Sequence, residues 1–355
     1  MNSRKYPRLV DVVSQKPPYP VAQRDVKDFA YSFFKNQIPA CDRLLSVFDN
    51  AGVEKRYFSA PLDWIGENRS FEERNNRYIQ DSLELSTLAA IKLFEKTGIE
   101  PSQIDHILFV STTGLATPSI DARLIGELGL KANTRRIPIW GLGCAGGVLA
   151  LAHCADLLRG YPGRTALIIN VELCGLTFNH GDFSKSNFIA TALFGDGATA
   201  ALVVGGETEF PGAEIIAQGE TTWPGSKDVM GWNFQSNGMQ VVFSRKIPQI
   251  VREKIADCLA DFLAEEDLQI TDIDHFLIHP GGAKVIRAYE EALSLNNDEL
   301  DAAKEVMRSN GNCSSCSVMH TIEEFLKRGI SKPGEYGLVT ALGPGFSAGN
   351  VLLKF

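Results

Sequence analysis

The sequence lacks any long apolar segment and any excess of positive charge. No uninterrupted apolar run reaches about 18 residues, so no segment is predicted to cross a bilayer as a helix. The first residues, MNSRKYPRLVDVVSQKPP, also lack the apolar core of a secretory signal. A formal net charge of -8 argues against general binding to nucleic acid or to anionic membranes. We therefore predict a cytoplasmic protein with no nucleic-acid partner and no stable membrane insertion.

Cysteine is scarce and irregularly spaced. The chain has 7 cysteines, an odd number, mostly within apolar stretches, which fits reduced thiols better than a disulfide framework. Cys313 and Cys316 form a C-x-x-C motif, which would suit redox chemistry or half of a zinc site. Because no second C-x-x-C is present, we predict neither a metal nor a redox cofactor.

The composition is that of an ordinary globular protein with a large core. Of its 355 residues, 44% are hydrophobic and 22% charged. A chain of this length exceeds the usual size of one hydrophobic core, so two units or one duplicated unit are expected.

Hydrophobic periodicity predicts a layered α/β fold. Apolar residues at three-to-four spacing predict helices over 23–51, 71–98, 119–129, 144–160 and 248–266. Strands that are buried on both faces are predicted for ILFVSTT, TALIINVEL, TAALVV, HFLIH and YGLVTAL. Residues 1–20 carry four prolines and are predicted to form a loose arm. Helices on both faces of a sheet follow from this pattern.

An internal repeat accounts for the length. The segments PSQIDHILFVSTTG (101–114) and QITDIDHFLIHPGG (269–282) share an Ile-Asp-His lead into a buried strand. Cys144 follows His106 by 38 positions, and Asn312 follows His275 by 37. Chance similarity of two short strands is the alternative. We predict two similar halves, 1–208 with the nucleophilic cysteine and 209–355 with the catalytic histidine and asparagine.

Cys144 is the candidate nucleophile. It lies in GLGCAGG, between an apolar strand and a helical pattern, where free N–H groups and the helix dipole favour a thiolate. The flanking glycines allow unusual backbone angles and leave space for a substrate. The alternative is an inert buried thiol.

His279 and Asn312 are the candidate partners of this thiol. His279 ends the strand HFLIH before Pro-Gly-Gly, a place where reactive side chains gather in α/β folds. Asn312, in SNGN, begins the equivalent helix of the second half, where its amide N–H can donate to a developing oxyanion. A simple helix N-cap is the alternative for Asn312.

These motifs resemble those of type III polyketide synthases, the chalcone synthase relatives among the thiolase-fold condensing enzymes. The resemblance spans nearly the whole chain and depends on GLGCAGG, ALFGDG, IHPGG, SNGN and ALGPGFS. The segments DVMGWNF and STTGLATPS are more similar to bacterial alkylpyrone and alkylresorcinol synthases. The resemblance implies an α/β, thiolase-like five-layered αβαβα fold made of two similar halves. It also implies a homodimer that uses coenzyme A thioesters and needs no cofactor.

The resemblance implies roles for the site residues. Cys144 takes a starter acyl group from acyl-CoA, while His279 and Asn312 promote decarboxylation of malonyl-CoA and stabilise the enolate. Phe194 and Phe243 match the two gatekeeper phenylalanines. The remaining matches are substrate-cavity positions, Thr112, Thr117, Cys174, Thr177, Ala190 and Ser314, and the loop Gly343, Pro344 and Gly345.

Two finer expectations follow from the resemblance. The small side chains of Thr117 and Ala190 predict room for a long fatty acyl starter, extended iteratively to tri- or tetraketide alkylpyrones or alkylresorcinols. Lys55 and Arg56 are the expected cations for the coenzyme A phosphates, with a solvated surface pair as the alternative.

Three other functions use similar residues. The nearest is ketoacyl-acyl-carrier-protein synthase III of fatty-acid initiation, which typically has His-Gln-Ala-Asn where this chain has HPGG. A cysteine hydrolase also combines Cys, His and Asn. A non-catalytic acyl-binding protein would keep the fold without the chemistry.

Overall fold

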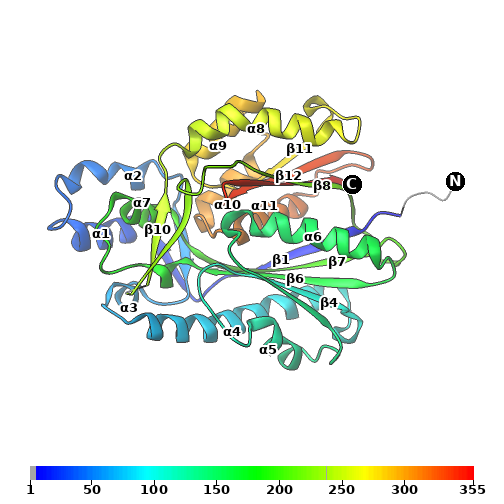
Figure 1. The fold of residues 1–355 in the computed structure, drawn as a ribbon, viewed down its shortest axis with the longest axis horizontal. Helices are drawn as coiled ribbons and strands as arrows, with labels where there is room; N and C mark the ends of the chain where they lie inside the picture. The colour runs from blue at the N-terminus through cyan, green and yellow to red at the C-terminus, as the bar shows by residue number, and fades with distance from the viewer. Residues whose placement is uncertain (1–4, 237) are drawn as a thin grey trace.

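Five alternating layers of helix and sheet make up the computed structural model, which describes residues 5–236 and 238–355. Helices α8 (Ile247–Ala264) and α9 (Ala283–Leu293) cover one outer face, as Figure 1 shows. The opposite face is covered by α4 (Phe71–Thr97) and α5 (Ile120–Glu127). The central layer, between the two parts of the sheet, contains α6 (Gly146–Gly160) and α11 (Ser315–Arg328). This is the αβαβα arrangement that the sequence predicted.

The sheet repeats one strand order in its two parts. The N-terminal part runs in the order β5 (Arg135–Ile139), β4 (His106–Val110), β6 (Thr165–Leu173), β7 (Asp196–Val204) and β1 (Arg8–Gln15). The C-terminal part runs in the order β11 (His275–Ile278), β12 (Tyr336–Gly343), β13 (Ser347–Lys354) and β8 (Ala213–Thr222).

Apart from β5, which has no counterpart among the described residues, the two orders match: β4, β6, β7 and β1 correspond to β11, β12, β13 and β8. The pairs β4–β6 and β11–β12 are parallel, and all later neighbours in each part are antiparallel. The two parts meet where Arg8 and Leu9 of β1 pair with Glu214 and Ala213 of β8. Two similar halves are therefore confirmed, and β4 and β11 correspond, as the Ile-Asp-His repeat predicted.

Close packing in the central layer explains one glycine of the GLGCAGG motif. A Cβ atom on Gly147 would lie 2.4 Å from the carbonyl oxygen of Ser315 and 2.8 Å from the side chain of Val318. Only glycine lets α6 approach α11 this closely. Gly147 thus serves helix packing, not the substrate access that the sequence predicted for it, and it brings the starts of the two central helices together.

Two predictions about the first 51 residues were wrong. Residues 8–15 are not a loose arm but form β1, the strand that joins the two parts of the sheet, with Leu9, Val12 and Val13 buried. The prolines flank this strand and do not interrupt it, so its ladder is intact. The helix predicted over 23–51 ends early, because Pro39 cannot continue it and Ala40 adopts a left-handed φ of 56°.

The chain between 23 and 51 therefore forms several short elements, which are α1 (Gln23–Phe34), a 3-10 turn (Cys41–Leu44) and α2 (Ser46–Asp49). The other four predicted helices and the five predicted strands are present, with small shifts of their ends. Within residues 5–236 and 238–355, no helix has the length and apolarity needed to cross a membrane.

Candidate active site

Cys144 lies in a 3-10 turn, Gly143–Ala145, that leads directly into α6. Gly143 has a φ of +48°, and a Cβ atom there would lie 2.7 Å from the ring of Pro344. The Gly143 N–H donates to the Thr112 hydroxyl at 3.1 Å. The turn is therefore held between Thr112 and the Gly343–Gly345 loop, and both of these predicted cavity segments lie against the thiol-bearing turn.

Asn312 is connected to Cys144 through Ser314. The Cys144 thiol lies 3.8 Å from the Ser314 hydroxyl, and the Ser314 backbone N–H donates to the Asn312 side-chain oxygen at 2.9 Å. The Asn312 amide N–H points the other way, toward the carbonyl of Gly281, at 3.4 Å. All these groups are buried, so the starts of the two central helices place a thiol and a carboxamide side by side.

His279 reaches the same place from the end of β11. It lines a cavity together with Asn312, Gly281 and Phe243. Its backbone N–H donates to Thr340 at 2.9 Å, and its Nδ1 atom has no hydrogen-bond partner among the described residues. The three predicted catalytic side chains thus converge on one buried region, and each comes from the element that the sequence analysis assigned.

Burial keeps both the thiol and the imidazole uncharged. It raises the pKa of Cys144 to about 12, with Glu172 adding to the rise and the Ser314 and Asn312 side chains opposing it. Burial lowers the pKa of His279 to about 3. Desolvation thus outweighs the helix dipole at Cys144 and opposes the thiolate expected at the helix start. A neutral imidazole is nevertheless a base that can accept a thiol proton.

Glu172, at the end of β6, is a buried acid that sequence reasoning missed. It accepts the Thr112 N–H at 2.9 Å and the Ser315 hydroxyl at 2.7 Å. Burial raises its pKa to about 7, although these hydrogen bonds act against the rise. Its signal in the sequence was a single carboxylate in the otherwise apolar strand TALIINVEL. The group adds a titratable charge beside Cys144.

The two phenylalanines predicted as gatekeepers face each other. Phe194 follows the last residue of α7 (Lys185–Leu193), and Phe243 ends β10 (Gly238–Phe243), which pairs with β9 (Met230–Gln235). Their ring centroids lie 6.1 Å apart in an edge-to-face arrangement. Phe243 lines the cavity of His279, whereas Phe194 lines a second cavity. Phe194 and Phe243 therefore lie between the His279 cavity and the second cavity.

The second cavity is mostly apolar. It contains three of the predicted substrate positions, Cys174, Thr177 and Ala190. Its other lining residues are largely aliphatic or aromatic: Val26, Phe29, Phe58, Leu62, Ile65, Gly175, Phe178, Asn187, Thr191, Trp232 and Val241. We call this the acyl cavity. Thr117 lies apart from it, exposed on the loop that precedes α5, so a single chain does not bring Thr117 to the site.

The structure corrects the prediction for Arg56. The residue is 0% exposed and cannot contact a phosphate, whereas Lys55 beside it is exposed. The Arg56 guanidinium donates to the carbonyls of Thr191, Ala192 and Phe194 at 3.0, 2.8 and 2.7 Å, and to the side chain of Gln23. Arg56 thus satisfies the last carbonyls of α7. The alternation in KRYF, strand β3 (Lys55–Phe58), which puts Arg56 on the same face as Phe58, was the missed signal.

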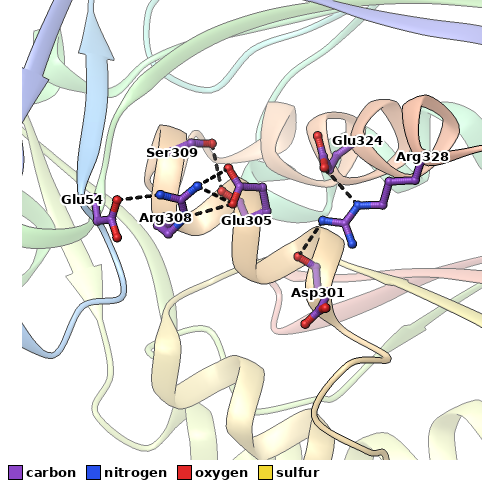
Figure 2. A network of polar contacts seen from close by, with 7 residues as sticks. All are labelled: Glu54, Asp301, Glu305, Arg308, Ser309, Glu324 and Arg328. Carbon is purple, nitrogen blue, oxygen red and sulfur yellow. Dashed lines mark hydrogen bonds and ion pairs between the residues drawn. The ribbon is translucent and has the colours of Figure 1, made fainter.

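The same strand is attached to the segment before Asn312. The Glu54 N–H donates to the carbonyl of Arg308 at 2.8 Å, and the Arg308 side chain donates to the Glu54 carboxylate at 2.6 Å. Arg308 also pairs with Glu305 on α10 (Asp301–Asn310), as Figure 2 shows. Residues 54–56 therefore connect the N-terminal half to the end of α10 on the surface and to Phe194 in the interior.

The two thiols of the C-x-x-C motif are directed to backbone carbonyls. Cys313 and Cys316 direct their thiols to the carbonyls of Asp196 and Gly197, at 3.3 and 3.2 Å. All seven cysteines are unpaired and buried. Within the described part of the chain, no group of three or more His, Cys, Asp or Glu residues is arranged to hold a metal ion.

Comparison with known proteins agrees with this geometry. Residues 62–208 match the family model "Chalcone and stilbene synthases, N-terminal domain", and residues 214–355 match the corresponding C-terminal domain. The chain is 40% identical to a "Putative chalcone synthase" of Bacillus subtilis, covering 98% of each chain. It is 35% identical to a 1,3,6,8-tetrahydroxynaphthalene synthase of Streptomyces peucetius, covering 96% of this chain and 90% of that protein.

Solved structures agree as well. The crystal structure of 1,3,6,8-tetrahydroxynaphthalene synthase from Streptomyces coelicolor, a bacterial type III polyketide synthase, superposes with a TM-score of 0.93 at 25% identity, covering 98% of this chain and 99% of that one. PKS-I from the brown alga Ectocarpus siliculosus gives the same TM-score and identity over 100% of both chains. The fold and site define a thiolase-like condensing enzyme. The chain belongs to the chalcone and stilbene synthase family, and it is an acyltransferase of the type III polyketide synthase class.

Proposed function

We propose that this polyketide synthase loads a long-chain fatty acyl group from acyl-CoA and extends it with malonyl-CoA, to give tri- or tetraketide alkylpyrones or alkylresorcinols. The observation that supports this proposal is the acyl cavity. Its lining is dominated by aliphatic and aromatic side chains, and the small side chain of Ala190 leaves room between them. Burying a chain of methylenes there contributes about 0.8 kcal/mol for each. An aliphatic starter is thus the ligand that this cavity favours.

The loading step uses the thiol and the imidazole. The Cys144 sulfur attacks the thioester carbonyl of acyl-CoA, and His279 accepts the thiol proton. The bond from the carbonyl carbon to the coenzyme A sulfur breaks, and coenzyme A leaves as its thiol with that proton. A neutral His279 is the protonation state that this step requires. The acyl group is then a thioester of Cys144, next to the acyl cavity.

The extension step uses the imidazole and the carboxamide. Malonyl-CoA loses carbon dioxide, and the electron pair of the broken carbon–carbon bond passes into an enolate. N–H groups of His279 and Asn312 donate to the enolate oxygen, in a site from which water is excluded. The enolate carbon attacks the Cys144 thioester and releases the Cys144 sulfur. Return of the extended chain to Cys144 starts the next round.

Coenzyme A thioesters are, in this proposal, the only small molecules that the reaction needs. Lys55 is exposed beside the buried Arg56 and is the remaining candidate for a phosphate contact. The seven unpaired cysteines support a cytoplasmic location.

A homodimer is part of the proposal. Strand β5 is the last strand at its end of the sheet among the described residues. Trp140, which follows it, and Leu115 on the neighbouring loop are 48% and 43% exposed. An unpaired strand edge beside exposed apolar side chains is suited to contact with a second copy. Because Thr117 lies on this same loop, the partner copy would bring it toward the site.

The test is turnover of purified protein with a panel of acyl-CoA starters, from acetyl to eicosanoyl, in the presence of malonyl-CoA. We expect kcat/KM to rise with chain length and mass spectrometry to find tri- and tetraketide pyrones or resorcinols. Products made from malonyl-CoA alone would contradict the fatty acyl starter. Strict dependence on acyl carrier protein would favour a fatty-acid initiation enzyme, and release of free fatty acid without carbon dioxide would favour a hydrolase.

A further inference from the structure

Arg74, the fourth residue of α4, carries a buried guanidinium with no hydrogen-bond acceptor in the part of the chain that the structure describes. The residue is only 8% exposed; its backbone N–H donates to the Ser70 carbonyl, but its guanidinium makes no hydrogen bond or ion pair with any residue among 5–236 and 238–355. The start of α4 is fixed by a capping box in which the Glu73 carboxylate accepts the N–H and the hydroxyl of Ser70. Glu73 also pairs with Arg69. The Glu73 charge acts on Arg74 from a distance, but the hydrogen bonds of its carboxylate go to Ser70 and Arg69, and the capping box fixes the start of the helix that carries Arg74.

The Arg74 side chain lines a cavity of its own. The other lining residues are Phe71, Asn75, Thr113, Leu176, Thr177, Asn179, Gly238 and Met239. We call this the Arg74 cavity. Thr177 lines both the Arg74 cavity and the acyl cavity. Thr113 lies one residue from Thr112, which holds the Cys144 turn. The Arg74 cavity therefore adjoins the substrate site.

An unpaired guanidinium that lines a cavity is suited to bind a ligand through its oxygen atoms. Burying a charge without a partner is costly, and an incoming acceptor removes that cost. The guanidinium is a planar fork that binds two oxygens held side by side. Each extension adds a ketone two carbons from the previous carbonyl, so a growing polyketide carries such oxygen pairs. Their enol and enolate forms are planar and rich in negative charge.

We propose that Arg74 binds the 1,3-dicarbonyl segment of the growing polyketide chain, as its enol or enolate. This inference depends on polyketide extension but not on the identity of the starter. Arg74 is a binding residue here, and Cys144, His279 and Asn312 carry out the bond changes. Holding the dicarbonyl segment in the Arg74 cavity keeps a triketide bound long enough for another extension. Arg74 thereby sets how far the chain grows before release.

The first test compares Arg74→Met with Arg74→Lys, using any starter that the wild-type protein extends. We expect acyl loading of Cys144, followed by intact mass, to be unchanged in both. The tetraketide-to-triketide ratio should fall roughly tenfold in Arg74→Met, the loss of one charged pair of hydrogen bonds, and less in Arg74→Lys. Arg69→Met is the matched control, because Arg69 directly precedes the cap of the same helix, has carboxylate partners in Glu67 and Glu73, and does not line the Arg74 cavity. It should leave the ratio unchanged.

The second test measures binding of a small dicarbonyl directly. Pentane-2,4-dione is titrated into wild-type protein, and its enolate absorbance is followed. We expect saturable binding that is lost in Arg74→Met and that acetate and inorganic phosphate displace only weakly. Equal or tighter binding of acetate or phosphate would make the cavity a general anion site and overturn the proposal.

An unchanged product ratio in a folded Arg74→Met protein would also overturn it. If Arg74→Met does not fold, the Arg74→Lys ratio and the wild-type titration decide. A wild-type protein that extends no starter at all would instead contradict the polyketide assignment itself, so the two failures are distinguishable.

Discussion

The peptide groups on either side of Phe194 pair with the backbone of Asn312. The Asn312 N–H donates to the carbonyl of Leu193 at 2.8 Å, and the Gly195 N–H donates to the carbonyl of Asn312 at 3.0 Å. Gly311, with a φ of +68°, permits this approach, because a Cβ atom there would lie 2.8 Å from the Leu193 oxygen. The proposed gatekeeper and the proposed enolate-binding amide are thus held by one short bridge between the halves.

Arg56 should be essential to that bridge. Replacing it with methionine leaves the buried carbonyls of Thr191 and Phe194 without this donor, while the Ala192 carbonyl keeps only the Gln23 amide. At about 1–3 kcal/mol for each buried acceptor left unsatisfied, Arg56→Met should destabilise the protein by about 3–5 kcal/mol. Chemical denaturation measures this loss. Extension should also slow more than loading, because Phe194 and Asn312 lose their fixed position.

Arg308→Met is the control for Arg56→Met. Arg308 fixes the same junction from the surface, through its ion pairs with Glu54 and Glu305 in Figure 2, and its side chain is 49% exposed. Exposed ion pairs contribute little, so the change in unfolding free energy should stay within about 1 kcal/mol. Equal destabilisation by the two variants would show that the interior hydrogen bonds of Arg56 contribute no more to the free energy of unfolding than the surface ion pairs of Arg308.

Alkylation of Cys144 should be slow at neutral pH. Cys144 stays protonated at pH values well above 7, because burial raises its pKa to about 12. The rate with iodoacetamide should therefore rise about tenfold per pH unit between pH 7 and 10, in proportion to the thiolate. Intact mass spectrometry measures the rate, and Cys144→Ala identifies the modified residue. A rate that is already constant near pH 7 would instead indicate a preformed thiolate–imidazolium pair.

Glu172→Gln should make this thiol more reactive. Ionised Glu172 raises the pKa of Cys144, and Glu172 ionises as pH rises through about 7. Removing the charge should speed alkylation at pH 8 by up to about tenfold, one pKa unit, with little effect below pH 6 where Glu172 is already neutral. Asp182→Asn is the control, because it removes a carboxylate that does not act on the pKa of Cys144. An equal gain at pH 6 and pH 8 would point to a structural change instead of a charge effect.

The layered fold and the positions of Cys144, His279 and Asn312 could be predicted from the sequence because they depend on local patterns. Apolar runs such as TALIINVEL favour burial on both faces, and the Ile-Asp-His repeat by itself aligns Cys144 with Asn312. Strand β1 was missed because the prolines around it favoured an irregular arm and because a bulge between Leu9 and Asp11 breaks the apolar alternation of a strand, although the valine-rich segment VDVV (10–13) has strand propensity.

The protonation states of buried side chains, and hydrogen-bond acceptors distant in the sequence, could not be predicted from the sequence. Arg56 looked like a surface cation because its acceptors, the last carbonyls of α7, lie more than 130 positions away and are backbone atoms. The pKa of Cys144 depends on how completely the surrounding layers exclude water, and the glycine-rich turn alone does not report that. Arg74 gave no signal for the same reason, since burial without a partner is a property of three-dimensional packing.

The acyl cavity predicts a length-dependent effect of Ala190→Phe. A phenyl ring at this position fills space in the acyl cavity, which Ala190 lines, so a long starter should lose room for about two methylenes. At about 0.8 kcal/mol per methylene, kcat/KM for a long acyl-CoA should fall more than tenfold. Turnover of acetyl-CoA should stay within about threefold, because a short starter does not reach the ring.

Ile189→Phe is the control for Ala190→Phe, because it adds the same phenyl ring to α7 outside the acyl cavity. Ile189 is the neighbouring residue of the same helix, is only partly buried, and packs against the other core, outside the acyl cavity. Its substitution should leave the ratio of long-chain to short-chain kcat/KM unchanged. A starter panel assayed with both variants therefore tests where the alkyl chain lies. If Ala190→Phe slows all starters equally, the chain occupies another part of the protein, and the apolar lining beside Phe194 has only a packing role.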